Sequence, residues 1–363
     1  MKGDVIMAKT LLDSIYGCLI ASAVGDALGA PTEGMMYKEI EEQYGRLTEF
    51  LPNPVHYTNH LPGAVTDDSQ MRHVICKTII DKGRRITPDD LANTMIAHLN
   101  PERVWISDVL ALERLKAGIS PWQSGFGGIP CGCACMGIAP IGIINAGDPE
   151  QAYQDGVCLS MVYNNGENTE FAGAFASAQA AAFIPDITID GIVTIILKYS
   201  TDIVKRAFDL TMNLAIKSSC VHEFKEKFYE KLLDWTWTLP RNVWNKEKFF
   251  SGNSREFVPV IFAILHFEKN LNEAIIEGAN FGRDCDTIAS MVGNIAGAMQ
   301  GASALRKDWI AICEHANEDM FEYVSGDKAK GFYYTAKKLV EAINNEKKYM
   351  MERVEFLNKL INN

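Results

Sequence analysis

The 363-residue sequence predicts an all-α protein. Apolar residues recur at the three- and four-residue spacing of helices through most of the chain, and runs with the alternation of a β-strand are scarce. Small residues also gather in apolar segments, which favours close helix packing. We expect one compact multi-helix domain over residues 1–363, because no stretch has the composition of a linker. A strand pair near residues 47–57 is a minor alternative.

The composition is that of a globular protein, with 47% hydrophobic and 22% charged residues. The net charge of −11 argues against a general nucleic-acid or anionic-membrane surface. The first four residues lack the plan of a signal peptide, and we expect no apolar run long enough to span a bilayer. Nine scattered cysteines do not resemble a secreted disulfide framework, so we expect the reducing cytoplasm. The sequence leaves the oligomeric state open.

The first predicted helix covers residues 11–28 and carries little charge, so we expect it at the centre of the fold. Its small residues allow a second helix to approach closely. The stop signal at residues 29–31 ends it, and Glu33 follows on a loop. Taken alone, Glu33 is a solvated loop acid.

Thr66 is predicted to cap the next helix, with Asp67 and Asp68 in its first turn. By itself this pattern needs no function, because acids at a helix start interact favourably with the helix dipole. Residues 87–90 repeat it, and we assign that second copy to capping.

A similar group, Asp284, Asp286 and Thr287, precedes a predicted small-residue helix at 287–299. Carboxylate and hydroxyl oxygens are ligands that suit Mg²⁺ or Mn²⁺. Four carboxylates brought together would raise one another's pKa values unless cations lay between them. If the two acidic groups meet, we expect a metal pair between them.

The region 118–147 is rich in glycine, which lets a backbone approach a ligand closely. No Gly-Lys-Ser/Thr follows, so it is not a P-loop. Cys131, Cys133 and Cys135 lie too close together to complete a four-ligand soft-metal site without a second cluster. We interpret them as buried packing residues, with a redox-sensitive thiol as the weaker alternative.

The apolar pattern of the following residues predicts successive helices at 149–162, 171–183, 189–217, 222–237 and 255–276. The last of these is one helix or two. The C-terminal part, 328–360, is charged and helical, and we expect breaks within it.

Three motifs resemble the ADP-ribosylglycohydrolase family: GCLIASAVGDALGAPTE at 17–33, PGAVTDDS at 62–69 and GRDCDTIA at 282–289. They occur in the family's order and near its spacing. The resemblance is clearest over residues 11–301 and leaves the C-terminal helices, 302–363, outside it. It implies an all-helical domain with two Mg²⁺ or Mn²⁺ ions. It also implies hydrolysis of the glycosidic bond at the anomeric carbon of an ADP-ribosyl group, carried by a protein or a small molecule.

By position, the resemblance implies six metal ligands: Thr66, Asp67, Asp68, Asp284, Asp286 and Thr287. Glu33 matches the acid of the family's first loop. The implied catalytic residues are therefore Glu33, Asp67 and Asp286.

The expected substrate contacts come from the glycine-rich region and two further positions: Gly125, Gly127, Gly128, Gly132, Met136, Asn164 and Arg283. Two features depart from the family. The stretch 132–137 lacks the Asn and Arg of the family's loop, and Asn164 falls near a position that is often His. Arg283 is an added cation, which pairs either with a substrate phosphate or with a neighbouring acid. These departures keep two alternatives open, a hydrolase of a free nucleoside-like or nucleotide-like glycoside and a non-catalytic ADP-ribose binder.

Overall fold

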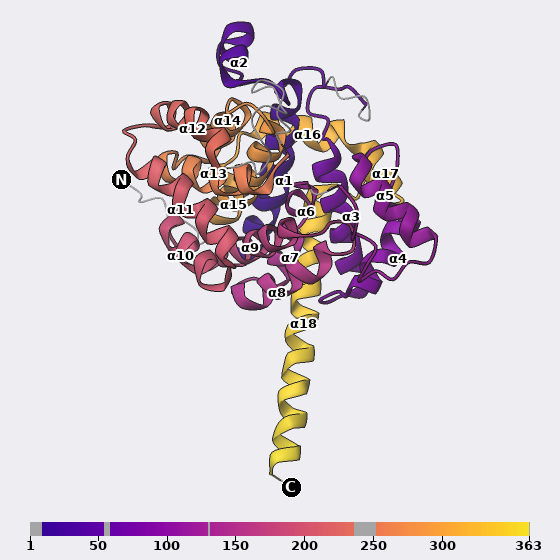
Figure 1. Ribbon diagram of the computed structural model, residues 1–363. Coiled ribbons are helices and arrows are strands. Elements are labelled where there is room, and N and C mark those ends of the chain that lie inside the picture. The colour runs from indigo at the N-terminus through magenta and orange to yellow at the C-terminus, as the bar shows by residue number, and fades with distance from the viewer. Residues whose placement is uncertain (1–8, 54–58, 130, 236–251, 363) are drawn as a thin grey trace, which may run out of the picture.

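The computed structural model describes residues 9–53, 59–129, 131–235 and 252–362 (Figure 1). Across these residues the chain is helical and contains no strand, apart from one isolated antiparallel bridge between Met36 and Gly282. The all-α prediction is confirmed. Residues 47–53 form no strand, and residues 54–58 of the predicted strand pair lie outside the described residues.

The α-helices, in chain order, are α1 (Leu11–Gly29), α2 (Tyr37–Tyr44), α3 (Asp67–Lys82), α4 (Pro88–His98), α5 (Ile106–Lys116), α6 (Cys133–Met136), α7 (Ala139–Ile144), α8 (Pro149–Ser160), α9 (Glu167–Ala181), α10 (Ile189–Tyr199), α11 (Asp202–Ile216), α12 (Val221–Trp235), α13 (Ser254–Phe267), α14 (Leu271–Ala279), α15 (Cys285–Gln300), α16 (Lys307–Ala316), α17 (Glu318–Ser325) and α18 (Phe332–Ile361). Short 3₁₀ turns at Ala30–Thr32 and Ala302–Ala304 follow α1 and α15.

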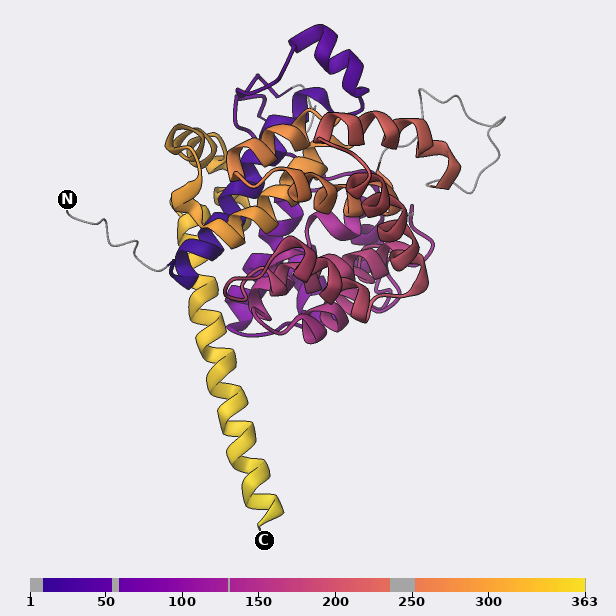
Figure 2. The same cartoon turned by 90° about the vertical axis from the view of Figure 1, so that its left-hand side faces the viewer.

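Helices α1 and α15 pack side by side in antiparallel directions at the centre of the fold (Figure 2). Their backbones touch. A methyl group added to Gly25 would lie 2.2 Å from the carbonyl oxygen of Ala289, and one added to Gly297 would lie 2.2 Å from that of Gly17. The small residues of both helices are therefore a steric requirement of this contact, since no real Cβ approaches so closely.

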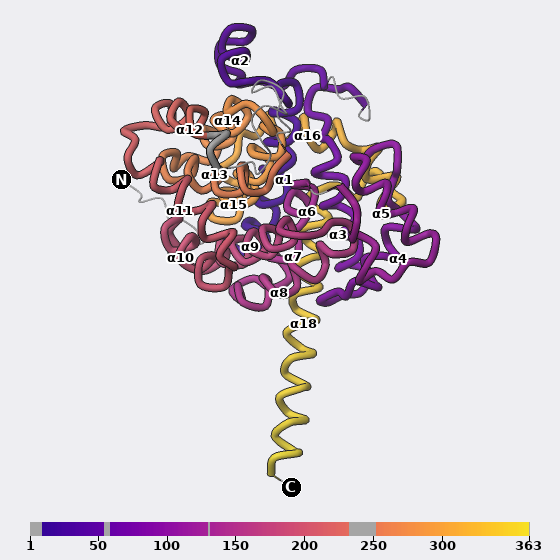
Figure 3. The backbone as a smooth tube through the Cα atoms, in the orientation of Figure 1, coloured from indigo at the N-terminus to yellow at the C-terminus, as the bar shows by residue number. Residues whose placement is uncertain are grey.

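The other helices cover this central pair. In the view of Figure 3, α3, α4 and α5 lie to one side of α1, and α10 to α13 lie to the other. Helix α9, also rich in small residues, is buried against α7, α8 and α10.

Two sequence predictions need correction. The segment Leu11–Thr32 is long and apolar enough to cross a membrane by composition, contrary to the expectation that no such run exists. In the fold 78% of its most apolar window is buried, because α1 is the core helix. The predicted helix at 189–217 is two helices, since Ser200 adopts an extended conformation that ends α10.

The open question at 255–276 resolves into two helices, α13 and α14. The breaks expected near the C-terminus are wrong. Helix α18 runs for 30 residues without interruption, and its last half projects from the body of the protein (Figure 1).

The contact between α1 and α15 predicts a specific sensitivity to added volume. We expect Gly297→Ala to lower the free energy of unfolding by about 1–3 kcal/mol or more, because its methyl group must push two helix backbones apart. Gly191→Ala is the matched control. It lies in α10, where the nearest atom is the flexible end of Ile187, so it should be neutral or stabilising. Urea denaturation measures both, and equal stability of the two variants would contradict the packing argument.

Candidate active site

The antiparallel packing of α1 and α15 brings the end of α1 to the start of α15. Gly29 makes this possible, because a methyl group there would lie 2.5 Å from the Cα atom of Asp286. The loop after α1 is then tied to the loop before α15. The Gly34 N–H donates to the Arg283 carbonyl (2.7 Å), and the Arg283 N–H donates to the Met35 carbonyl (2.6 Å). Glu33 is therefore held beside the second acidic group.

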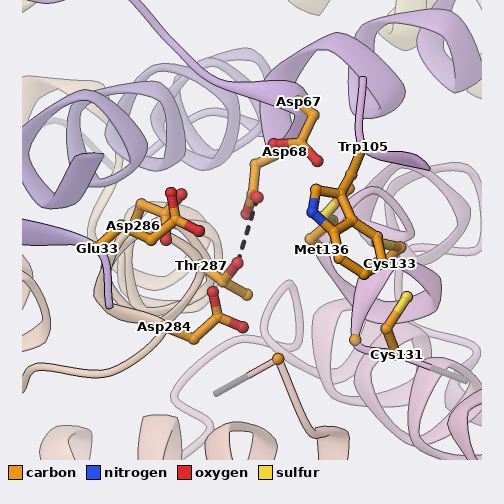
Figure 4. A pocket seen from close by; sticks show the side chains of 12 residues that line it. Glu33, Asp67, Asp68, Trp105, Cys131, Cys133, Met136, Asp284, Asp286 and Thr287 are labelled. Carbon is orange, nitrogen blue, oxygen red and sulfur yellow. Dashed lines mark hydrogen bonds between the residues drawn. The ribbon is translucent and has the colours of Figure 1, made fainter. Parts of the chain in front are cut away.

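Glu33, Asp284 and Asp286 form one carboxylate cluster (Figure 4). One oxygen from each of the three lies within 4.8 Å of the others. Asp284 precedes the first turn of α15 and Asp286 lies within it, so their backbone positions follow from the start of this helix. The cluster confirms that these three residues, far apart in the sequence, meet in space.

Helix α3 supplies the remaining acids, and the buried carboxylate of Asp26 on α1 positions its first turn. Asp26 accepts the Thr66 N–H (2.8 Å), the Ser69 N–H (3.1 Å) and the Ser69 hydroxyl (2.6 Å). Thr66 caps α3 as predicted, its hydroxyl oxygen accepting the Asp68 N–H at 3.4 Å. Asp67 and Asp68 thus start a helix that is anchored to the core.

A hydrogen bond joins the two acidic groups directly. The Thr287 hydroxyl donates to Asp68 Oδ2 at 3.2 Å, drawn as the dashed line in Figure 4. From the sequence, a metal pair is expected only if the two acidic groups meet. In the structure, residues 66–68 do meet residues 284–287.

Arg72 is a buried cation behind the site. Its guanidinium donates to the hydroxyls of Ser69 (3.0 Å) and Ser290 (2.6 Å) and to the Met136 carbonyl (3.3 Å). It thereby connects α3 with α15 and with the stretch that holds α6. Sequence reasoning missed both Asp26 and Arg72. A charged side chain in the apolar second half of α1 was the available signal.

The two acidic groups line one pocket, and this pocket has two chemically different walls (Figure 4). One wall carries five carboxylates and a hydroxyl: Glu33, Asp67, Asp68, Asp284, Asp286 and Thr287. The opposite wall carries an aromatic ring, two thiols and a thioether: Trp105, Cys131, Cys133 and Met136, with Gly132 and Gly252 beside them. Within the described part of the chain, no Lys, Arg or His side chain lines this pocket.

The buried acids repel one another. Burial, together with the charges of Asp26 and Asp67, raises the pKa of Asp68 well above its usual value. Burial, together with Glu33 and Asp68, does the same to the pKa of Asp286. One oxygen on each of Asp68 and Asp286 is buried without a hydrogen-bond partner.

Two further acids of the pocket, Asp284 and Glu33, have pKa values shifted into the neutral range. Burial and the neighbouring charge of Asp67 raise the pKa of Asp284 to about 7. Loss of hydration, followed by the charges of Asp284 and Asp67, raises the pKa of Glu33 to about 8. The Glu33 side chain still reaches the surface, and solvent there screens part of this repulsion.

The residues present fit a bound cation. The acidic wall offers only oxygen donors, two of its buried oxygens lack partners, and its carboxylates destabilise one another unless a positive charge lies among them. Such a donor set suits a hard divalent ion. The cluster could therefore hold metal.

The structure separates the expected substrate contacts into two groups. Gly132 and Met136 line the pocket, whereas the others do not: Gly125, Gly127, Gly128, Asn164 and Arg283. Arg283 is 3% exposed and pairs with the buried carboxylate of Glu256 (Nη2 to Oε2, 2.9 Å). We expected Arg283 to pair either with a substrate phosphate or with a neighbouring acid, and the structure shows it paired with an acid. Asn164 lies one layer behind the pocket, donating to the Cys131 carbonyl at 3.2 Å.

The segment 105–133, which supplies part of the pocket wall, contains a buried acid that the sequence analysis did not predict. Asp108 is fully buried, both its carboxyl oxygens lack hydrogen-bond partners, and it lies with Asp67 and Cys133 in a group whose ligand atoms are within 4.8 Å of one another. Burial raises its pKa well above the usual value. The three clustered cysteines are buried, as predicted, but Cys131 and Cys133 also face the pocket. A hydrogen bond with Cys133 lowers the Cys131 pKa to about 7.

The all-helical fold, the acid-lined pocket between α1, α3 and α15 and a family match together define a glycosidase-type hydrolase. The family model for ADP-ribosylglycohydrolases matches residues 7–347, and the chain belongs to this family. It is similar to a solved chain titled as an ADP-ribosylglycohydrolase-related protein complex, with a TM-score of 0.65 over 93% of this chain and 98% of that one. That likeness is at 17% identity and shows the fold alone.

Relatives match most of the chain. An uncharacterised protein of Archaeoglobus fulgidus is 26% identical over 79% of this chain and 87% of its own length. The Escherichia coli protein YegU is 22% identical over 81% of this chain and 89% of its own. The ADP-ribosylarginine hydrolase Tri1 of Serratia proteamaculans is 24% identical over 82% of this chain and 75% of its own.

The anchoring role of Asp26 predicts an effect on metal binding without contact with the metal. We expect Asp26→Asn to weaken Mn²⁺ binding at least tenfold and to cost about 1–3 kcal/mol of stability, because an amide cannot accept all three hydrogen bonds from Thr66 and Ser69. Asp81→Asn, an exposed acid on the same helix, is the matched control. Calorimetric titration with Mn²⁺ distinguishes them, and unchanged affinity in Asp26→Asn would refute the anchoring role.

The raised pKa of Asp284 predicts that metal-free protein loses stability as the pH rises. Between its ordinary pKa of 3.8 and about 7, the folded state holds a proton that the unfolded state releases, so unfolding becomes easier through this window. Thermal melts with a chelator from pH 5 to pH 8 measure this. We expect Asp284→Asn to reduce the loss, and saturating Mn²⁺ to oppose it. An equal pH dependence in wild type and Asp284→Asn would contradict the shift.

Proposed function

We propose that the protein is a metal-dependent hydrolase that cleaves the glycosidic bond at the anomeric carbon of an ADP-ribosyl group. The observation that carries this is the meeting of five carboxylates and Thr287 in one pocket of a chain that belongs to the ADP-ribosylglycohydrolase family. Similarity to an ADP-ribosylarginine hydrolase supports an ADP-ribosyl substrate, on a protein or a small molecule. The pocket joins Glu33 with residues as far along the chain as Thr287, which supports one domain across this span of the proposed 1–363. The nine cysteines are all free thiols and most are buried, which is compatible with the cytoplasmic location that we propose.

The residues that would hold two Mg²⁺ or Mn²⁺ ions are Thr66, Asp67, Asp68, Asp284, Asp286 and Thr287. The unpartnered buried oxygens of Asp68 and Asp286 support this set. When bound, such ions supply a positive field that orients ribose hydroxyls and acidifies water. In this proposal Asp67 and Asp286 contribute to catalysis because they would hold the metal ions.

Glu33 carries the proton transfer in this proposal. Burial, followed by the charges of Asp284 and Asp67, raises its pKa to about 8, near enough to neutral pH for a carboxyl group both to give and to take a proton. The backbone pairing of Gly34 with Arg283 keeps it over the cluster rather than free in solvent. Glycosidic cleavage needs such a group, because the leaving atom must gain a proton or the attacking water must lose one.

The wall of Trp105, Gly132 and Met136 would hold the apolar face of the sugar or the group attached to it. Gly125, Gly127, Gly128 and Asn164 would act from behind this wall by fixing its shape. The Asn164 bond to the Cys131 carbonyl supports that indirect role. Arg283 would position the Asp284 loop through its ion pair with Glu256.

A second candidate is a hydrolase of a free nucleoside-like or nucleotide-like glycoside. It is favoured by the absence, among the described residues that line the pocket, of a cationic side chain to pair with a phosphate. Five acids in one pocket speak against a third reading, a binder without catalysis, because a binder has no need of a general acid.

Substitution of Glu33 tests the mechanism. We expect Glu33→Gln to lower kcat at least a hundredfold while product binding remains, because proton transfer is lost and the shape is kept. Glu42→Gln, an exposed acid of α2, should be unaffected. The measurement is ribosyl release from ADP-ribosyl-arginine, ADP-ribosyl-serine and free ribosyl compounds, with Mg²⁺, with Mn²⁺ and with a chelator. Full turnover by Glu33→Gln, or in the chelator, would refute the mechanism. Turnover of free ribosyl compounds alone would select the second candidate.

A further inference from the structure

Among the described residues, none buries a side chain in the second half of α18. Residues 347–362 are exposed along their whole length, and the helix projects well beyond the other helices in both views (Figures 1 and 2). The family match covers residues 7–347, so most of this projecting segment lies beyond the matched range. A helical segment gains most of its stability from packing of an apolar face, so a partner that covered this segment would stabilise it.

The projecting segment carries an apolar stripe formed by Met350, Val354, Leu357 and Ile361, at spacings of four, three and four residues. These side chains are 38–78% exposed. The stripe continues the helix face that is buried upstream at Leu339 and Ala342, because both sets follow the same helical period. The face that packs on the body therefore runs past the edge of the body and remains uncovered.

The spacing is that of a two-stranded coiled coil. Val354 and Ile361 occupy heptad a positions and Met350 and Leu357 occupy d positions, so the stripe has the apolar a/d seam of a coiled coil. A basic membrane-binding face is absent from this stretch. Three acids alternate with four bases over residues 346–359, and the whole chain is acidic.

We propose that this stripe binds the same stripe of a second copy of the chain, with the two α18 helices antiparallel. The orientation follows from the position of the stripe on the body-facing side of α18. A parallel partner laid on it would run upward into the body of the first copy, whereas an antiparallel partner places the second body beyond the free end of the helix (Figure 2).

The antiparallel register pairs the stripe with itself. Met350 of one copy lies opposite Ile361 of the other, and Val354 lies opposite Leu357, which gives four mixed a–d layers. Lys347 and Lys348 then approach the C-terminal end of the partner helix, where the helix dipole favours cations. The dimer leaves the pocket untouched, since none of its lining residues lies on α18.

The association state of the full chain tests this proposal. Sedimentation equilibrium should show a wild-type dimer, and Leu357→Asp should raise the dissociation constant at least tenfold, because a charge enters the buried stripe. Phe356→Asp is the matched control, since it adds the same charge to an adjacent exposed apolar residue outside the stripe. Circular dichroism and ribosyl release verify that the body remains folded. A monomeric wild type, including one that cosediments with anionic vesicles, would overturn the proposal, as would equal effects of the two variants.

Disulfide trapping tests the orientation. Cys220 is exposed and is first replaced by serine. In that background the double variant M350C/I361C should form a covalent dimer on mild oxidation, while M350C alone should not. Crosslinking by M350C alone would overturn the antiparallel arrangement in favour of a parallel one.

Discussion

The close contact between the backbones of α1 and α15 is the constraint on which the site depends. Glycines at positions 17, 25 and 297 let the two helices approach very closely. The carbonyl groups of one helix occupy the space that a side chain on the other would need. At this separation the antiparallel direction decides which residues meet. The end of α1 reaches the start of α15, so Glu33 joins Asp284 and Asp286 without any long side chain bridging the gap.

Behind the pocket, a layer of buried polar groups converts this helix contact into a defined orientation of α3. Asp26 accepts three hydrogen bonds from the first turn of α3, and Arg72 returns contacts to Ser290 on α15. The positive charge of Arg72 lies among these anchoring groups rather than at the pocket surface. The acids at the front therefore keep their mutual repulsion, which is the electrostatic condition that a divalent cation relieves.

The sequence predicted the parts of this site that depend on local chemistry. A cap such as Thr66 and acids in a first helical turn are encoded within a few residues, and so is the charge-poor character of α1. Contacts between distant residues were out of reach. The pairing of Arg283 with Glu256, the burial of Asp108 beside Cys133 and the anchoring by Asp26 all depend on packing between helices that no local pattern specifies. The unbroken α18 was missed for a related reason, since charged residues in a projecting helix resemble those of a loop.

The two walls of the pocket come from separate stretches of the chain. The acidic wall belongs to α3, to the start of α15 and to the loop after α1. These three helices hold one another by backbone contact and buried hydrogen bonds, whereas Trp105, Cys131, Cys133 and Met136 come from the intervening segment. Substitutions at Trp105 or Met136 can reshape the ligand-facing surface while the backbone contact that sets the carboxylates of α15 and the loop after α1 stays in place. Evolution can therefore retune selectivity and preserve reactivity, because the two properties are inherited through physically separable pieces of the same cavity.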